Sequence, residues 1–121
     1  MKNISLIIFV LMLNGIGFTT ELNDTRWLVH NKKVEVLFKK SEGKYHAVAV
    51  KVATDFDKVS VGDTIVRNIV FTIKDNSLNS GNIKLGRMSA RFSGRIENDT
   101  ILSVDIGKLF IKKQQKWKRV Q

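Results

Sequence analysis

Apolar and polar side chains alternate with a period close to two through most of the chain from Trp27 onward. This period is typical of half-buried β-strands, because successive side chains of a strand point to opposite faces of the sheet. Residues 33–39 and 48–52 show it, on either side of a turn at residues 41–44. We expect the interior to be lined by their apolar sets, Val34, Val36 and Phe38 in the first segment and Val48, Val50 and Val52 in the second.

The second half of the chain contains the clearest hairpin. Residues 88–96 alternate without a break, and residues 102–106 follow after the polar turn residues 97–100, whose Asn and Asp side chains can bond their own backbone. The apolar sets of this hairpin are Met88, Ala90, Phe92, Gly94 and Ile96, and Leu102, Val104 and Ile106. Residues 64–74 form another candidate strand, with Ile65, Ile69, Phe71 and Ile73 on one face.

The remaining candidate strands are the apolar run 109–111 and the terminal segment 115–120, whereas residues 75–82 are the segment richest in turn-forming residues. About seven or eight short strands without a helical segment predict an all-β domain. Closing such a sheet removes its exposed edges, so we favour a single antiparallel meander barrel of the calycin or lipocalin-like kind. An open two-layer sandwich is the alternative.

Residues 1–20 have the pattern of a cleavable signal peptide. Lys2 precedes an apolar run over residues 4–13, and small and helix-breaking residues follow as far as Thr20. A membrane anchor needs about 18 or more consecutive apolar residues, and this run ends at Asn14. We therefore expect cleavage near residues 17–20, a single domain over residues 21–121, and export to the periplasm or the medium.

The absence of cysteine from the chain excludes a disulfide framework and the lipid-bearing cysteine of a bacterial lipoprotein. The core alone must therefore stabilise the domain. After cleavage we expect no transmembrane anchor.

The charge balance is strongly positive, with 21 Lys and Arg against 11 Asp and Glu. Since Lys2 alone of these lies in the leader, 20 cations and 11 carboxylates give the remaining domain a net charge of +9. Such a field attracts anionic partners such as lipid head groups or acidic polysaccharide. The candidates for a basic surface lie near the C-terminus: Lys112, Lys113, Lys116, Lys118 and Arg119.

Aromatic residues interleave with these cations, which is a pattern of surfaces that stack on nucleic-acid bases. The alternative, which we favour, is that Trp117 closes one end of the barrel while the lysines stand in solvent, with Trp27 as a matching plug. No nucleic-acid partner is expected.

No catalytic motif is recognisable. The two histidines, His30 and His46, have no cysteine to complete a common metal site, and His46 shares the parity of the valines that follow it. Asp105 lies in the middle of a candidate strand, where it needs solvent or a cation, and no serine lies in a nucleophile elbow. We therefore expect no enzyme, metal or cofactor, and the candidate ligand or barrel-end residues are Trp27, His46, Asp105 and Trp117.

The segment 90–107, followed by Trp117, Lys118, Arg119 and Val120, resembles the bacterial exported family catalogued as domain of unknown function 2147. In that family a strand with an L-x-V-x-G-x-I-G-like pattern precedes a terminal W-x-R-V-like strand. Trp27 and the strand containing Tyr45 also match in order, whereas Thr25 and Ala47 stand where the family has glycines, and the family's long Asp- and Pro-rich segment is shortened to residues 53–63. The resemblance implies a lipocalin-like barrel and export, and it carries no catalytic residues.

Three functions remain as hypotheses, and the least favoured is an enzyme that uses Asp105 or His46, which a compact polar cleft containing either residue would support. The leading one is a non-enzymatic barrel that binds a small apolar or amphipathic ligand at one open end. The alternative is an interaction protein whose cationic face docks on anionic lipid or polysaccharide of the cell envelope. An interior filled with side chains and lacking a cavity at either end would exclude the first hypothesis.

Overall fold

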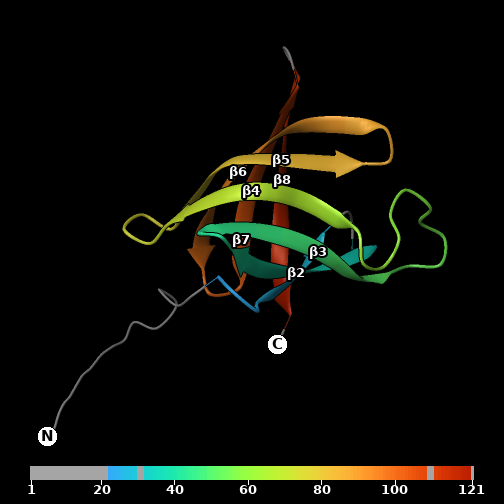
Figure 1. The fold of residues 1–121 in the computed structure, drawn as a ribbon, viewed down its shortest axis with the longest axis horizontal. Coiled ribbons are helices and arrows are strands. Elements are labelled where there is room, and N and C mark those ends of the chain that lie inside the picture. Colours follow the sequence, from blue (N-terminus) through green and yellow to red (C-terminus); the bar gives the residue numbers. More distant parts are fainter. Residues whose placement is uncertain (1–21, 30–31, 109–110, 121) are drawn as a thin grey trace, which may run out of the picture.

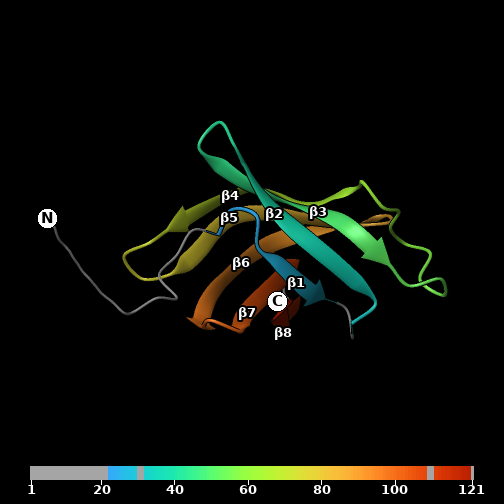
Figure 2. The same ribbon diagram turned by 90° about the horizontal axis from the view of Figure 1, so that it is seen from below.

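The computed structural model describes residues 22–29, 32–108 and 111–120, and these residues form an eight-stranded antiparallel barrel (Figures 1 and 2). The strands are β1 (Arg26–Val29), β2 (Val34–Ser41), β3 (Lys44–Val52), β4 (Thr64–Thr72), β5 (Ser77–Leu85), β6 (Met88–Asn98), β7 (Ile101–Lys108) and β8 (Ile111–Val120). Each strand pairs with the next in sequence, and β8 returns to β1. The predicted closed meander barrel is confirmed and the two-layer sandwich is wrong. The expected leader, residues 1–20, and His30 lie outside the described residues.

Short polar turns join several strands, as the sequence predicts. Between β6 and β7 the side-chain Oδ1 of Asn98 accepts hydrogen bonds from the backbone N–H groups of Thr100 (2.9 Å) and Ile101 (3.1 Å). Between β2 and β3 both turn residues, Glu42 (φ 53°) and Gly43 (φ 80°), have positive φ, which matches the twist of the paired strands.

Large aromatic side chains fill the middle of the barrel. The ring of Trp117 on β8 lies 5.4 Å from that of Phe92 on β6 and 6.3 Å from that of Phe38 on β2, measured between ring centroids. All three residues are at most 1% exposed. Glycine is required at position 94 of β6, because a Cβ there would lie 2.7 Å from the backbone oxygen of Ser103 on the neighbouring strand β7.

The predicted phase of β3 is wrong. Tyr45, Ala47 and Ala49 are buried, whereas Val48 and Val50 are only half-buried on the opposite face. In the β2–β3 register Ala47 lies opposite Phe38, so a small side chain accompanies a large one on the inner face.

A bulge changes the phase of β4. Asn68 has a positive φ of 63°, and the exposed pair Arg67 and Asn68 separates Val66 from Ile69, which are both fully buried. Ile65 is buried as expected, but Ile73 is 57% exposed because β4 ends before it.

The sequence pattern misses β5 and divides β8. Residues 77–82, read as part of a turn, belong to β5, whose alternation is interrupted where the β5–β6 register shifts between Leu78 and Gly81. Residues 111–120 form one strand rather than two.

The two ends of the barrel differ, and we name them by their connections. The closed end carries residues 22–25 and the β2–β3, β4–β5 and β6–β7 turns; the mouth carries the loop of residues 53–63 and the β5–β6 turn, which project on the same side in Figures 1 and 2. Nothing in the described ranges forms a helix long and apolar enough to cross a membrane.

Candidate functional site

A cavity of about 610 Å³ opens at the mouth. The strand register places its walls on the inner face of the barrel, because Ala90 pairs with the buried Ile83 and Lys113 pairs with Ile106. The lining comes from the 53–63 loop and from β5 to β8: Phe56, Lys58, Leu85, Met88, Ala90, Ile106, Lys108, Ile111, Lys113 and Gln115. We call this space the mouth cavity.

The mouth cavity has an apolar wall that continues to an apolar lip. Leu85, Ala90 and Ile106 are buried in the wall, at 7–8% exposure. At the lip, Met88 is 41% exposed and Ile111 is 67% exposed. These positions expose apolar surface at the opening of a hollow, where a ligand could cover it.

Among the described residues that line the mouth cavity, the charged side chains are all cations. Lys108 and Lys113 stand at inner-face positions of β7 and β8, and Lys58 comes from the loop. Within the described residues none of the three forms an ion pair. Since a lysine stem can lie along apolar surface while its ammonium reaches water, these residues suit an anionic group held at the opening.

Trp117 lies beneath this cavity. Its indole Nε1 donates a hydrogen bond of 3.0 Å to Oε1 of Gln115, which itself lines the cavity. The structure therefore places Trp117 inside the barrel, between the mouth and the closed end.

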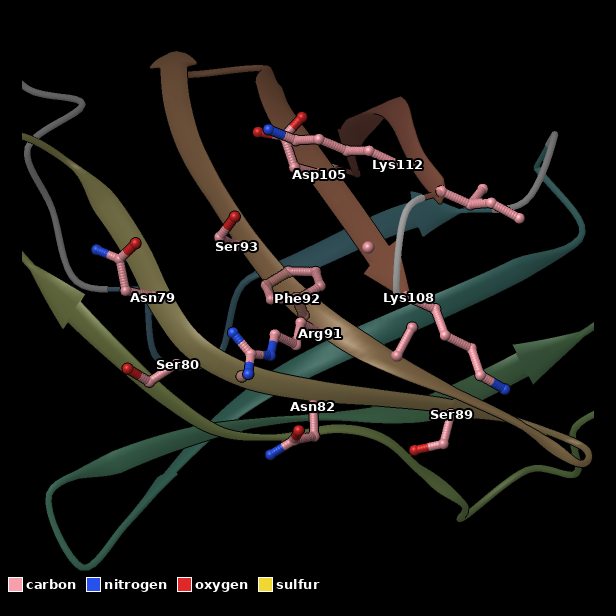
Figure 3. Close-up of a pocket in the computed structure, with 14 residues that line it drawn as sticks. Asn79, Ser80, Asn82, Ser89, Arg91, Phe92, Ser93, Asp105, Lys108 and Lys112 are labelled. Atoms are coloured by element: carbon pink, nitrogen blue, oxygen red, sulfur yellow. The ribbon is translucent and has the colours of Figure 1, made fainter.

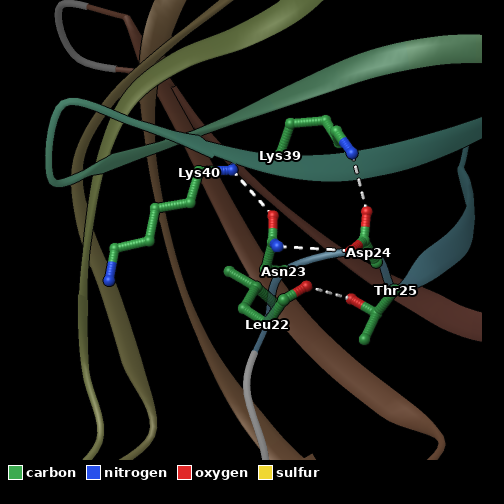
Figure 4. Close-up of polar contacts among 6 residues, drawn as sticks. All are labelled: Leu22, Asn23, Asp24, Thr25, Lys39 and Lys40. Carbon is green, nitrogen blue, oxygen red and sulfur yellow. Dashed lines mark hydrogen bonds and ion pairs between the residues drawn. The ribbon is translucent and has the colours of Figure 1, made fainter.

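Trp27 lies at the closed end, where it pairs with Arg119 and is buried. Residues 22–25 lie at the same end and contact Lys39 and Lys40 of β2 (Figure 4). The Trp27 indole donates to Oγ1 of Thr25 (2.9 Å), and that hydroxyl donates to the backbone oxygen of Leu22 (2.6 Å). Asp24, with a φ of 66°, forms a 2.8 Å ion pair with Lys39.

A second hollow, of about 1360 Å³, lies along β5 to β8, and most of its lining belongs to the outer face of the sheet (Figure 3). We call it the outer groove. Amide, hydroxyl and cationic side chains dominate its lining, which includes Asn79, Ser80, Asn82, Ser89, Arg91, Ser93, Asp105, Lys108 and Lys112.

Asp105 lines the outer groove, where the register places it between Ser93 and Gln114. Among the residues that line the groove it is the one carboxylate, and no histidine accompanies it. In residues 22–29, 32–108 and 111–120 no three His, Asp or Glu side chains cluster as metal ligands would.

His46 is on the outer face of β3, contrary to the expectation that its side chain faces the interior. Its register partner is the exposed Lys39, and its Nδ1 accepts a hydrogen bond of 3.3 Å from the backbone N–H of Asn68. His46 therefore bonds a backbone group at the β4 bulge and contributes to neither hollow.

The five basic candidates do not form one surface, because strand alternation divides them. Lys112, Lys116 and Lys118 are on the outer face of β8, whereas Lys113 lines the mouth cavity and Arg119 lies opposite the buried Trp27. The five candidates therefore do not share one face of β8.

Lys116 is also neutralised locally. It lies 2.6 Å from the Glu97 carboxylate, which also accepts a hydrogen bond from Ser103. Hydrogen bonds from Lys116 and then Ser103 hold the pKa of Glu97 below its usual range.

Sequence reasoning missed most of the lining of both hollows. Asn79, Ser80 and Asn82 belong to the strand that was read as a turn, and a bulge concealed its alternation. Lys108 and Lys113 could have been found, because continuing the alternation of Leu102, Val104 and Ile106 through the last hairpin places both on the inner face.

Compared with models of protein families, with curated proteins and with solved structures, the chain matches none.

Proposed function

We propose that this chain is an exported, non-enzymatic barrel that binds a small amphipathic ligand in its mouth cavity. The observation that carries the proposal is the combination of an apolar wall and lip with three lysines at one opening. An apolar chain would cover the exposed parts of Met88 and Ile111, and an acidic head group would meet the lysines.

The size of the cavity supports this class of ligand. Pockets for small molecules commonly measure about 300–1,000 Å³, with mostly apolar walls and a few polar groups that fix orientation. The leader-like pattern of residues 1–20 and the resemblance to domain of unknown function 2147 support export as part of the same proposal.

Docking of a cationic face on the envelope has less support. Its sequence basis is the net charge of +9 together with the C-terminal basic segment, and the cations of that segment are divided between the two faces of β8. The lysines that remain close together at the mouth are better explained by a ligand held there.

Calorimetric titration of the protein with dodecanoate, below the concentration at which this amphiphile forms micelles, tests the proposal. We expect the lip variants Met88→Glu and Ile111→Glu to weaken dodecanoate binding by about tenfold each, which corresponds to about 1.4 kcal/mol, since each replaces apolar surface that the chain covers with a carboxylate. Both lip residues are exposed, so the fold should tolerate the substitutions.

Ile73→Glu is the matched control, because Ile73 is 57% exposed at the closed end, and its titration should equal that of the unsubstituted protein. Absence of dodecanoate binding, or equal loss in all three variants, would contradict the proposal.

A further inference from the structure

The mouth cavity and the outer groove meet. Ala90, Lys108 and Ile111 line both hollows. The mouth cavity has a mostly apolar lining and the outer groove a mostly polar one. The shared residues therefore lie where the lining changes from apolar to polar.

The strand pairing explains why the two hollows meet there. Among the described residues, the β6–β7 pairing begins at Arg91 opposite Gly107, and Met88, Ser89 and Ala90 have their pairing partners on β5. The β7–β8 pairing ends at Lys108 opposite Ile111. We call the end of the described β6–β7 pairing, at the mouth, the notch, and the outer groove begins beside it.

The outer groove has a seat for an anion beside the notch. One row of register partners crosses four strands: Asn82, Arg91, Gly107 and Lys112. Arg91 and Lys112 are two strand spacings apart, about 9–10 Å between backbones. Gly107 between them has no side chain, and a Cβ there would have no contact closer than 3.8 Å. In Figure 3 the two side chains extend away from one another, Lys112 toward Asp105 and Arg91 toward Asn82. Both are exposed, so each can turn toward an acidic group that lies over Gly107.

The groove around this seat suits sugar hydroxyls. Ser93, Asp105 and Gln114 form the neighbouring row, and Asn79, Asn82 and Ser89 extend the lining along β5 and β6. These amides, hydroxyls and the carboxylate can donate to or accept from hydroxyl groups in either direction.

We infer that the ligand is an acidic glycolipid, whose apolar chain enters the mouth cavity and whose acidic sugar head lies in the outer groove between Arg91 and Lys112. This inference rests on the proposed function, because it requires the chain to occupy the mouth cavity. A polysaccharide alone would leave the apolar lip exposed, and a simple fatty acid would leave the outer groove empty. The shared lining residues favour one molecule that occupies both hollows.

Four probes separate the contributions of the apolar chain, the sugar and the acidic group to binding: dodecanoate, dodecyl β-D-glucoside, dodecyl β-D-glucuronide and free glucuronate. Each is titrated calorimetrically, the three amphiphiles below their micelle concentrations. We expect the glucuronide to bind at least about tenfold more tightly than either other dodecyl amphiphile, because charge-assisted hydrogen bonds to an acidic group are strong. Free glucuronate should bind far more weakly than the glucuronide.

The double variant Arg91→Gln/Lys112→Gln should lose the advantage of the glucuronide over the glucoside. Its matched control is Arg95→Gln/Lys118→Gln, which removes the same charges from the outer faces of the same two strands, at positions that do not line the groove. The control should keep the advantage. All four side chains belong to exposed or partly exposed residues, so both variants should fold, which circular dichroism would check.

The outcomes separate this inference from the proposed function. If all three amphiphiles bind equally, the glycolipid assignment is overturned while ligand binding at the mouth stands. If glucuronate alone binds as tightly as the glucuronide, the groove is an independent site and the single-ligand inference is overturned. If no amphiphile binds, both proposals fail.

Discussion

The two ends of the barrel satisfy their side chains in opposite ways. At the closed end Leu22 and Trp27 are each 1% exposed, and the Trp27 indole and the Thr25 hydroxyl both have hydrogen-bond partners within the protein. At the mouth, apolar side chains at the lip stay exposed, and Lys108 and Lys113 form no ion pair with the residues described. The comparison indicates that one end stabilises the fold, whereas the other leaves apolar surface and positive charge accessible.

The difference arises from the chain segments that reach each end. Residues 22–25 are tied to β2 by backbone hydrogen bonds from Asp24 to Phe38 (2.7 Å) and from Phe38 to Thr25 (3.0 Å), and by a bond from the Lys40 N–H to Asn23 Oδ1 (2.8 Å). The loop of residues 53–63 instead contributes to the rim of an open cavity. One segment covers its end, and the other borders an opening.

Removing the aromatic floor between the two ends should have the largest effect. Trp117→Ala deletes a fully buried side chain that packs on Phe38 and Phe92, and we expect the free energy of unfolding to fall by about 3–5 kcal/mol. Urea denaturation followed by circular dichroism measures it. The matched truncation at the lip, Met88→Ala, should cost much less, and equal losses would mean that the mouth is as important to stability as the floor.

Removing the hydrogen bonds at the closed end should have the next largest effect on stability. Thr25→Val keeps the shape of the side chain but leaves the Trp27 indole and the Leu22 carbonyl without this partner, so we expect a loss of about 1–3 kcal/mol. The exposed Thr72 allows the same substitution as a control. A Thr25→Val variant as stable as Thr72→Val in urea would show that the closed end does not depend on these bonds.

How far the sequence predicts the structure depends on whether a strand keeps its period. In β6 and β7 the alternation is unbroken, and the hairpin and its inner face are predicted correctly. In β3 the alternation predicts Val48, Val50 and Val52 as the inner set, but Ala47 faces inward, opposite the large Phe38. Which face is buried depends on the side chain across the interior, which the local pattern does not contain.

The candidate site was harder to predict because both hollows depend on irregular features. The polar lining from β5 follows a bulge near Ser80, whose φ is 65°, and such a position resembles a turn in sequence. The notch at the mouth depends on where the β6–β7 pairing stops, at Arg91 opposite Gly107. These are properties of register between strands, so a pattern read along one strand cannot reveal them.

Replacing an apolar side chain at the lip should weaken ligand binding and leave the stability almost unchanged. We expect Ile111→Ser to change the free energy of unfolding by no more than about 0.5 kcal/mol, because the side chain is 67% exposed and away from the buried core. The same variant should bind dodecanoate more weakly in the calorimeter, since the chain loses apolar contact at the lip. A variant that loses stability but keeps its affinity would assign the lip to the fold and reverse the comparison.

The smallest expected effect concerns Glu97, whose ion pair with Lys116 lies on the outer face of the barrel. Because Lys116 and Ser103 lower the pKa of the folded carboxyl, the unfolded state takes up the proton first as the pH falls. The stabilisation is therefore complete above the ordinary glutamate range, which is near pH 4.3, and it is lost as the pH falls through the lower pKa of the folded state. The pair is exposed to solvent and screened by salt, so the change should be slight.

Thermal melts of the unsubstituted protein and of Glu97→Gln between about pH 3 and pH 7 measure this contribution, because the amide cannot titrate there. The difference in melting temperature should be present at pH 7 and should shrink toward pH 3. Lys116→Gln should reproduce it, since it removes the first cause of the lowered pKa. By contrast, Lys113→Gln at the mouth removes a cation that has no ion pair in the described structure. It should therefore leave the change of melting temperature between pH 7 and pH 3 as it is in the unsubstituted protein. If Lys113→Gln instead changed it as Lys116→Gln does, the mouth lysines would have carboxylate partners and would not be held ready for a ligand.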